Sequence, residues 1–383
     1  MLNIHIYPSY LTNESRILKE TLSIIEKTQV SHILVLGFWK GDLLRNEKVY
    51  ENVSFVRINC YFNNTDSSKF LRQISFVVFY FRCFLYCIRK PVRILNCHAL
   101  TVLPLCVVLK IFKGAKLIYD THELETETNG SVGYRKKISK VLEKKLIVHS
   151  DFVLTVSDSI CDWYKTTYNL ENIAVLKNIP AKKDYGERKE LKKILEITEE
   201  KLLFIYQGYL TKSRGVLEIL EAFESLDSSK HILFMGFGPL VDKIIARSNK
   251  CSNIHFIKGV SPKEVLSYTA GADIGIHIIL NTCLNHYYCL PNKVFEYASA
   301  GIPFIASNFP DLRSEFEKHN ISWFGEPSAQ GLVKVIGAIT LDDFNEKKKN
   351  SMEKRNFWSW EIQEHFLQEV YLKLLETNSN NCD

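Results

Sequence analysis

Short runs of valine, isoleucine and leucine alternate with helix-length segments along the whole chain. These runs have the length and composition of buried strands. They lie at residues 2–7, 32–38, 53–58, 92–97, 116–120 and 152–156, and again at 202–208, 231–236, 253–259, 273–278 and 302–307. Strands that alternate with helices form parallel sheets with helices on both faces. The pattern therefore predicts a doubly wound α/β protein.

A polar, charge-dense stretch at 180–201 divides this series of strands about evenly. Its composition suits a linker followed by a surface helix, which favours two sheets over one. We predict two Rossmann-like domains, residues 1–180 and 181–356. The last segment, 357–383, begins with a helical pattern that has aromatic side chains to bury and no strand after it, and it ends in a polar tail. We expect this helix to return to the first domain.

The sequence at 69–90 predicts one long helix with an apolar stripe and a basic side. The stripe consists of Phe70, Ile74, Val77, Phe81, Phe84 and Ile88, and the basic side of Lys69, Arg72, Arg82, Arg89 and Lys90, with Phe76 and Phe79 among them. We expect the stripe to pack on the first sheet, while the basic side faces either solvent or an anionic membrane surface. The longest apolar run, 74–88, has 15 residues and contains Arg82, so we do not expect it to cross a bilayer.

Charge is unevenly distributed along the 383 residues. The whole chain carries 49 Lys and Arg against 43 Asp and Glu, for a net charge of +6, whereas residues 1–180 alone hold 24 basic and 16 acidic side chains. No acid lies between Asp66 and Asp120, where nine basic residues fall. One basic face without a nucleic-acid-binding motif argues against a nucleic-acid partner and for an anionic surface.

The cysteines and the first ten residues indicate a protein of the cytoplasm, which is a reducing compartment. None of the ten cysteines forms a C-x-x-C pair, and they stand singly in apolar segments, as small core residues do in a reducing environment. The first ten residues, MLNIHIYPSY, lack the basic start and apolar stretch of a signal peptide. We therefore expect a cytoplasmic protein that can lie peripherally on the inner face of the cell membrane.

The segment CLPNKVFEYASAGIPFIAS, residues 289–307, carries the most specific chemistry. A loop enters a helix through Asn292 and Lys293, and backbone N–H groups with a lysine at a helix start form an anion site suited to a pyrophosphate. Glu296 projects from the same face of the helix, where a carboxylate can accept both hydroxyls of a ribose. The alternative is a solvated Lys–Glu pair on an ordinary helix.

Two glycine turns that follow predicted strands favour the anion site. Lys212 and Arg214 stand at a helix start behind Gly208, and a guanidinium can bind phosphate through two parallel hydrogen bonds. Gly236 and Gly238 form a second turn, where backbone could approach a ligand closely, although ordinary loop turns often have such a sequence. Neither the G-x-G-x-x-G dinucleotide fingerprint nor the Walker phosphate loop is present.

Two histidines follow strands of the first predicted domain. His98 and His122 each stand at a strand end, which is where ligands bind in open α/β sheets. A lone histidine after a strand is more often structural. His122 lies between Asp120 and Glu123, and these polar neighbours favour a functional role.

In their order and spacing, segments from nearly the whole chain resemble glycosyltransferase family 4. They are NESRILKE (13–20), NCHALTVLP (96–104), YDTHELETE (119–127), LTVSDSI (154–160), LKNIP (176–180), YQGYLTKSRG (206–215), FMGFGP (234–239), LPNKVFEYASAGIPFIAS (290–307) and WSWE (358–361). The resemblance implies the GT-B fold, in which two Rossmann-like domains face a central cleft and the last helix crosses back to the first domain. It also implies sugar transfer from a nucleotide donor bound to the C-terminal domain, usually with retention at the anomeric carbon.

The resemblance gives individual residues roles. Arg214, with Lys212, resembles the family's grip on the donor phosphates, and Glu296 is similar to the second glutamate of its E-x7-E motif, which holds the ribose. The first glutamate is replaced by Tyr288, and the arginine of the family's G-R-L turn by Tyr209. The N-terminal glycine-rich loop is also missing, with Tyr7-Pro8-Ser9-Tyr10 in its place. His98, or His122 with Glu123, would contact the transferring sugar or position the acceptor hydroxyl.

From these residues we predict a retaining glycosyltransferase that uses a UDP- or GDP-sugar to extend a lipid-linked glycan of the cell surface. We expect no metal, because the chain contains no D-x-D pair, and no cofactor besides the nucleotide-sugar substrate. The alternatives are a nucleotide-sugar epimerase of the same fold and a catalytically inactive sugar-nucleotide-binding scaffold. An epimerase should carry several acid–base carboxylates in its cleft, and this sequence offers few. The inactive scaffold remains an alternative because Tyr288 and Tyr209 replace residues of the family's motifs.

Overall fold

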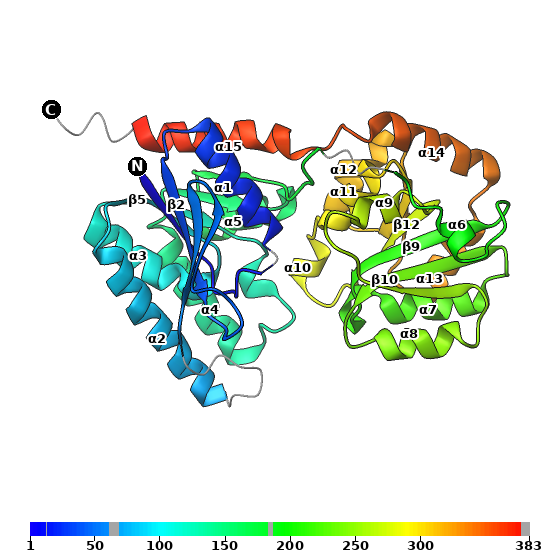
Figure 1. The fold of residues 1–383 in the computed structure, drawn as a ribbon, viewed down its shortest axis with the longest axis horizontal. Helices are drawn as coiled ribbons and strands as arrows, with labels where there is room; N and C mark the ends of the chain where they lie inside the picture. The colour runs from blue at the N-terminus through cyan, green and yellow to red at the C-terminus, as the bar shows by residue number, and fades with distance from the viewer. Residues whose placement is uncertain (13, 61–68, 183–186, 377–383) are drawn as a thin grey trace. The chain divides into compact units, whose positions relative to one another are not determined.

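The chain folds into two compact units, each built around its own sheet (Figure 1). The computed structural model describes residues 1–12, 14–60, 69–182 and 187–376. Unit 1 comprises Met1–Lys177 and the chain from Ile362 onward, and unit 2 comprises Asn178–Glu361. Both units alternate strands with helices, so the predicted pair of Rossmann-like α/β domains is confirmed.

Unit 1 contains an eight-stranded sheet in the order β3-β4-β2-β1-β5-β6-β7-β8. Its strands are β1 (Leu2–Ile6), β2 (His32–Phe38), β3 (Asn46–Tyr50), β4 (Val53–Ile58), β5 (Val92–Cys97), β6 (Lys116–Asp120), β7 (Phe152–Thr155) and β8 (Ile173–Val175). All neighbours are parallel except β3, which pairs antiparallel with β4. The strand order reverses between β1 and β5, and in such sheets ligands bind at the carboxyl ends of the strands at that point.

Unit 2 contains a six-stranded parallel sheet in the order β11-β10-β9-β12-β13-β14. Its strands are β9 (Leu202–Tyr209), β10 (Lys230–Phe237), β11 (Ile254–Lys258), β12 (Ile274–His277), β13 (Phe304–Ser307) and β14 (Ser322–Gly325). Counted within the unit, this order is 3-2-1-4-5-6, the arrangement of dinucleotide-binding sheets. The order reverses between β9 and β12, so their carboxyl ends mark the expected binding position.

Helices cover both sheets. Unit 1 has α1 (Ser15–Lys27), α2 (Lys69–Ile88), α3 (Leu103–Lys113), α4 (Gly133–Ile147) and α5 (Asp158–Tyr168), with 3₁₀ turns at Leu100–Val102 and Glu125–Glu127. Unit 2 has α6 (Leu191–Ile194), α7 (Val216–Ser225), α8 (Val241–Ser248), α9 (Val265–Thr269), α10 (Leu284–Tyr287), α11 (Asn292–Ser299), α12 (Pro310–Phe316), α13 (Ala329–Gly337) and α14 (Leu341–Lys354), with 3₁₀ turns at Lys212–Arg214 and Glu317–His319. The last helix is α15 (Trp360–Glu376).

The core of unit 2 lies on both faces of its sheet. On β9, Leu203 and Ile205 join one apolar cluster, with Phe295 and Phe316, while Phe204 joins another cluster on the opposite face. Because successive strand residues point to opposite faces, a continuous apolar run is what a sheet covered on both sides requires. This is why the short runs of valine, isoleucine and leucine predicted the strands well.

Helix α15 packs on unit 1, as predicted. The hydroxyl of Tyr371 lies 3.1 Å from Asn3 Oδ1 and 2.9 Å from Asn96 Oδ1, between β1 and β5. Ser23 on α1 donates to Glu364 at 3.1 Å. The aromatic side of the final helix is therefore buried on the first sheet.

Helix α2 turns a different face to the sheet from the one predicted. Phe79 is fully buried, 4.6 Å from Phe38 of β2 between ring centroids, and Cys83 and Cys87 on the same side are also buried. The predicted stripe is instead exposed or half-buried, with Phe81 at 62% and Val77 at 68% exposure. The predicted face was wrong because the helix is apolar on several sides, and small cysteines, which pattern counting does not favour, allow the closest approach to the sheet.

The length of α2 also exceeds the predicted apolar run. Within the described part of the chain, Phe70–Ile88 is the stretch whose length and composition would allow it to cross a membrane, and 22% of it is buried. The prediction that the run is too short was wrong, because the run was counted from residue 74 and the apolar helix begins earlier. By composition alone such a stretch is equally typical of a helix that packs on a soluble domain.

Candidate functional site

The first candidate site lies in unit 2, where the strand order reverses. Gly208 stands near the carboxyl end of β9 and His277 at the end of β12. Helix α11 begins at Asn292, directly after the extended residue Pro291, and carries Lys293 and Glu296. The 3₁₀ turn that follows β9 carries Lys212 and Arg214. The predicted anion-binding residues therefore come from segments that follow neighbouring strands of one sheet.

Lys293 lies directly against Gly208. A Cβ atom at Gly208 would come within 2.6 Å of Lys293 Cε, and Gly208 has a φ of +114°, a conformation that favours glycine. Burial, followed by the charge of Arg214, lowers the pKa of Lys293 to about 8. A lysine that is partly desolvated and forms no ion pair is destabilising in the free protein, and an anionic ligand would reduce that cost.

Arg214 and Lys212 differ in exposure. Arg214 is half-buried, whereas Lys212 is exposed. Among the residues that the structure describes, no carboxylate forms an ion pair with either of them or with Lys293. The site therefore combines two half-buried cations that form no ion pair with a described acid, although the negative charge of Glu296 acts on Lys293.

Glu296 is held in place by a buried hydrogen-bond chain. Gln207 on β9 donates through Nε2 to Glu296 Oε2 at 2.6 Å. Thr269 Oγ1 in turn lies 2.5 Å from Gln207 Oε1 and 2.7 Å from the carbonyl oxygen of Val265, so these two acceptors share its single hydrogen. One carboxylate oxygen of Glu296 is thus fixed by β9, and the other accepts no hydrogen bond from the described residues, so it can accept from a ligand.

His277 is a member of this site that sequence reasoning missed. Its side chain is 1% exposed, and neither ring nitrogen has a hydrogen-bond partner among the described residues. Burial, then the charges of Lys293 and Arg214, hold its pKa well below the usual range, so the imidazole is neutral. The available signal was its position, a polar residue at the end of a buried strand.

The second glycine turn has a structural explanation. A Cβ atom at Gly236 would come within 1.9 Å of the carbonyl oxygen of Gly208, because β9 and β10 run side by side there. Gly238 has a φ of +147° and lies against the backbone of Leu210. Close packing of the two strand ends accounts for both glycines, and their contact with a ligand stays a prediction.

The second candidate site lies in unit 1, where β1, β5 and β6 end. His98 Nε2 lies 2.8 Å from His5 Nδ1, and His98 Nδ1 lies 3.0 Å from His122 Nε2. Asp120 Oδ2 lies 3.2 Å from His98 Nδ1 and 3.1 Å from His122 Nε2. His98 is fully buried, whereas the His122 side chain is 20% exposed. The structure therefore brings both predicted histidines together, with only His122 at the surface.

The hydrogens of this cluster can be assigned from its last acceptor. His5 Nε2 lies 3.0 Å from Asn3 Oδ1, which only accepts, so that nitrogen carries the hydrogen. His5 Nδ1 then accepts from His98 Nε2, and His98 Nδ1 accepts from His122 Nε2. Burial lowers the pKa of His98 to about 4 and that of His5 well below its usual range, so both rings are neutral. In the neutral form of His122, Nδ1 is left as an acceptor toward the surface.

Asp120 connects the histidine cluster to Arg16. Arg16 on α1 donates to both of its oxygens, at 2.7 and 3.1 Å, and to the carbonyl of Leu176. Burial alone would raise the pKa of Asp120, but Arg16 and the charge and hydrogen bond of His122 hold it well below its usual range. The carboxylate is therefore charged at neutral pH and orients His122.

Atoms of the same cluster have the spacing of metal ligands. His98, Asp120 and His122 each place one ligand atom within 4.8 Å of the others, and His5, Glu20 and His98 do likewise. A cation at either position would lie beside the Arg16 guanidinium, which already binds Asp120 and approaches Glu20 at 2.8 Å. This charge pattern fits a hydrogen-bond network better than a metal centre.

The remaining predicted residue, Glu123, is exposed beside His122. Two residues further on, Glu125 was not predicted, and burial followed by the charge of Glu143 raises its pKa to about 8. Glu143 itself accepts from the hydroxyls of Tyr119, Tyr164 and Tyr168 at 2.8–2.9 Å. Burial therefore raises the pKa of two carboxyl groups of unit 1, Glu125 and Glu143.

Comparison with known proteins agrees with the geometry of unit 2. Residues 187–357 match the family model of glycosyl transferases group 1. The match includes Lys212, Arg214, Lys293, Glu296 and His277. Over this range the chain is similar to glycosyl transferases group 1.

One relative is a Bacillus subtilis protein assigned by name to teichuronic acid biosynthesis as the glycosyltransferase TuaC. It is 25% identical over 197 residues, which is 50% of this chain and 48% of the relative. The match therefore spans about half the length of that protein.

Solved structures share the fold over nearly the whole chain. Sucrose-phosphate synthase from Thermosynechococcus elongatus superimposes with a TM-score of 0.80 at 13% identity, over 98% of this chain and 100% of its own. Anabaena HepE, solved in complex with UDP-glucose, gives 0.69 at 11% identity over 99% and 100%. The lipopolysaccharide outer core galactosyltransferase WaaB gives 0.65 at 12% over 99% and 100%. At these identities the likeness establishes the fold alone.

Proposed function

We propose that this chain is a retaining glycosyltransferase of family 4 type, which moves a sugar, a hexose in the simplest case, from a UDP- or GDP-sugar to a glycan acceptor. The observation that carries the proposal is the site of unit 2, where the half-buried Lys293 and Arg214 lie at the strand-order reversal beside Glu296. A diphosphate and a ribose are the ligand groups that this combination fits.

On the donor side, the chemistry is electrostatic. When the bond between the sugar and the nucleoside diphosphate breaks, negative charge develops on the leaving phosphate. Lys293 and Arg214 stabilise that charge from a partly buried position, where its effect is large. Glu296 holds the ribose hydroxyls with the oxygen that Gln207 leaves available. The two cations supply the positive charge, so the proposal includes no metal and no cofactor besides the donor.

On the acceptor side, retention without a covalent enzyme intermediate requires the acceptor hydroxyl to approach from the side of the leaving group. The bond from its oxygen to the anomeric carbon forms as the bond to phosphate breaks, and the proton passes to the departing phosphate oxygen. His122 Nδ1 orients a sugar hydroxyl, and Asp120 and His98 fix the ring that presents it. In this proposal His98 is a positioning residue rather than a catalytic one, because it is buried.

The biological setting is also part of the proposal. A relative assigned to teichuronic acid biosynthesis supports a role in cell-surface polysaccharide synthesis, and the likeness to WaaB is compatible with it. We infer a lipid-linked acceptor and a peripheral position on the inner face of the membrane. Exposed apolar side chains on α2 and α3, such as Phe81 and Phe112, support that position.

The test of the donor site is a thermal-shift panel of nucleotides and nucleotide sugars on the intact protein. We expect UDP or GDP sugars to raise the unfolding temperature, and we expect Glu296→Ala to lose that stabilisation while keeping its own unfolding temperature. Glu221→Ala, an exposed position on α7, is the control. Unchanged stabilisation of Glu296→Ala would refute the ribose role.

The alternatives give different outcomes with the best donor. An epimerase would convert the nucleotide sugar without any acceptor, and an inactive scaffold would bind it without turnover. Transfer to a lipid-linked acceptor, followed by NMR of the anomeric configuration in the product, tests both the activity and its retaining course.

A further inference from the structure

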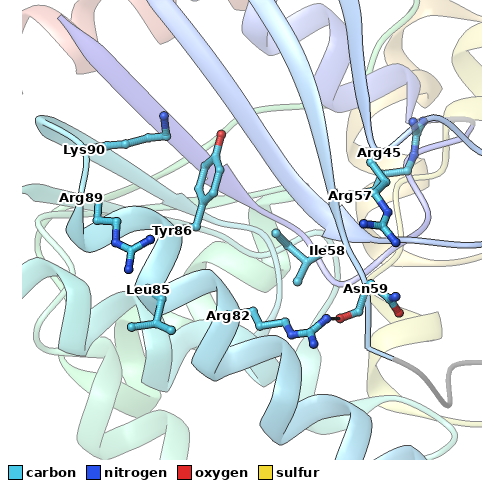
Figure 2. Close-up of a pocket in the computed structure, with 9 residues that line it drawn as sticks. All are labelled: Arg45, Arg57, Ile58, Asn59, Arg82, Leu85, Tyr86, Arg89 and Lys90. Carbon is cyan, nitrogen blue, oxygen red and sulfur yellow. Dashed lines mark hydrogen bonds between the residues drawn. The ribbon is translucent and has the colours of Figure 1, made fainter.

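Unit 1 contains a pocket with a cationic lining that the proposed sugar transfer does not use. It lies between α2 and the strands β3 and β4 and has a volume of about 520 Å³ (Figure 2). It is lined by Arg45, Arg57, Ile58, Asn59, Arg82, Leu85, Tyr86, Arg89 and Lys90. Figure 2 shows the residues of the end of α2 on one side and Arg45, Arg57 and Asn59 on the other, with Arg82 between them.

The lining is strongly cationic. Five of its nine residues carry a positive charge, and none of them is an acid. Arg57 is a lining cation that forms an ion pair: it is buried and pairs with Glu47 at 2.7 Å. It also donates to the backbone carbonyls of Tyr10, Leu11 and Leu44. Arg57 therefore builds the wall of the pocket, and the remaining cations supply its charge.

Among the described residues, Arg45, Arg89 and Lys90 form no ion pair with a carboxylate. Arg82 donates to the carbonyl of Asn59 at 2.6 Å. Lys90 lies 4.8 Å above the ring of Tyr86, and Arg45 lies 4.8 Å above the ring of Trp39. Aromatic rings orient a cation without cancelling its charge. The exposed Arg89 forms no ion pair with any described residue. The pocket is thus prepared for an anion.

The pocket borders an exposed apolar surface. Val77 and Phe81 on α2 are 68% and 62% exposed, and Phe112 on α3, whose ring lies 5.5 Å from that of Phe84, is 65% exposed. At 3.6 residues per turn, Phe81 and Leu85 are neighbours on the helix surface, and Leu85 lines the pocket. An apolar strip and a cationic pocket therefore adjoin along one helix.

We propose that this pocket binds the phosphate head group of an anionic lipid whose chains contact the strip of Val77, Phe81, Phe84 and Phe112. A phosphate alone would need the cations but not the strip, and a neutral lipid would need the strip but not the cations. The combination fits a molecule with both parts, and the volume is sufficient for a head group. This site belongs to unit 1 and is separate from the nucleotide-sugar site of unit 2.

The test compares two matched double variants of the full chain in vesicle co-sedimentation. Arg89→Gln with Lys90→Gln removes two pocket cations, and Lys144→Gln with Lys145→Gln removes two exposed cations of α4. Vesicles of phosphatidylcholine alone are compared with phosphatidylcholine mixed with phosphatidylglycerol. We expect the pocket variant to lose about thirtyfold in affinity for the anionic vesicles, and the α4 variant much less.

Two further measurements identify the source of the phosphate. Phe81→Ser should weaken vesicle binding and leave any binding of inorganic pyrophosphate unchanged. An equal loss in the two double variants would overturn the proposal, because the charge would then act without a site. Tight pyrophosphate binding without any vesicle preference would overturn it in favour of a soluble phosphate. All variants should keep the stabilisation by the nucleotide sugar, so this test is independent of the proposed transfer activity.

Discussion

At the scale of single residues, the donor site depends on a lysine in a place where lysine is costly. Gly208 leaves room for the Lys293 stem, and burial places its ammonium group beside Arg214. Neither contact stabilises the charged form. The free protein therefore holds a cation whose charge is better accommodated when an anion binds, which is a form of preorganisation.

This arrangement predicts a pH dependence of donor binding. Lys293 has a lowered pKa of about 8 in the free protein, and a bound diphosphate would raise that pKa, so binding takes up a proton above pH 8. We expect the affinity for the nucleotide to fall by about tenfold between pH 8 and 9.5. Titration calorimetry in buffers of different ionisation enthalpy measures both the affinity and the proton uptake.

The matched variants for this prediction are Lys293→Met and Lys212→Met. The first should bind weakly and without this pH dependence, whereas the second, at an exposed position, should keep it. The same pH profile in Lys293→Met and the unaltered protein would assign the titration to another group.

A second residue-scale prediction concerns Asp120. Asp120→Asn removes the carboxylate that binds two nitrogens of the buried Arg16 and leaves Glu20 as its remaining acidic neighbour, so we expect the free energy of unfolding to fall by about 3 kcal/mol. Because its pKa is held below the ordinary value, the contribution of Asp120 is present at neutral pH and is lost as the pH falls through the acid range. Urea unfolding measures the change, and Asp162→Asn, an exposed position paired with Lys165, should change stability by less than about 0.5 kcal/mol.

The sequence predicted the cations of the proposed donor site but not all of the residues that the structure brings together there. Arg214, Lys293 and Glu296 were predicted because each stands at a helix start in a recognisable order. His277 was missed because a single histidine ending an apolar strand has the same pattern as a core residue. The buried position of His98 also could not be predicted, since it depends on Arg16 and Asp120, which lie 104 residues apart.

At the scale of elements, strands were predicted better than the packing of helices. A strand buried on both faces is apolar throughout, so its position follows from composition alone. The antiparallel edge strand β3 was missed because its sequence, NEKVY, is mostly polar. The orientation of α2 was wrong for the opposite reason: so many of its positions are apolar that hydrophobicity does not select one face.

The orientation of α2 gives a prediction that compares two phenylalanines on one helix. Phe79 is fully buried and Phe81 is 62% exposed. We expect Phe79→Ala to lower the free energy of unfolding by about 3–5 kcal/mol, because it leaves a cavity against the sheet. Phe81→Ala should change it by less than about 0.5 kcal/mol. Urea unfolding of both variants decides between the two faces, and a larger loss for Phe81→Ala would restore the predicted stripe.

At the scale of the whole molecule, the chain completes unit 2 and then ends in unit 1. Helix α15 supplies Tyr371, whose hydroxyl bridges Asn3 and Asn96, and Asn3 also accepts from His5 of the histidine cluster. The last helix therefore stabilises the inner end of the hydrogen-bond chain that begins at His122. The donor residues all lie between Asn178 and Glu361 and share none of these contacts.

Tyr371→Phe tests whether α15 stabilises unit 1 without affecting the binding of a nucleotide sugar to unit 2. The variant keeps the buried ring and removes only the hydroxyl, which leaves the acceptors of Asn3 and Asn96 with one hydrogen bond fewer, so we expect a loss of about 1–2 kcal/mol in the stability of unit 1. Its transition can be followed by hydrogen exchange of β1 and β5. Stabilisation by the best nucleotide sugar should stay unchanged, because that ligand is bound by unit 2. A weaker response to the donor in this variant would mean that α15 couples the first sheet to the donor site, and the separation of roles between the units would have to be abandoned.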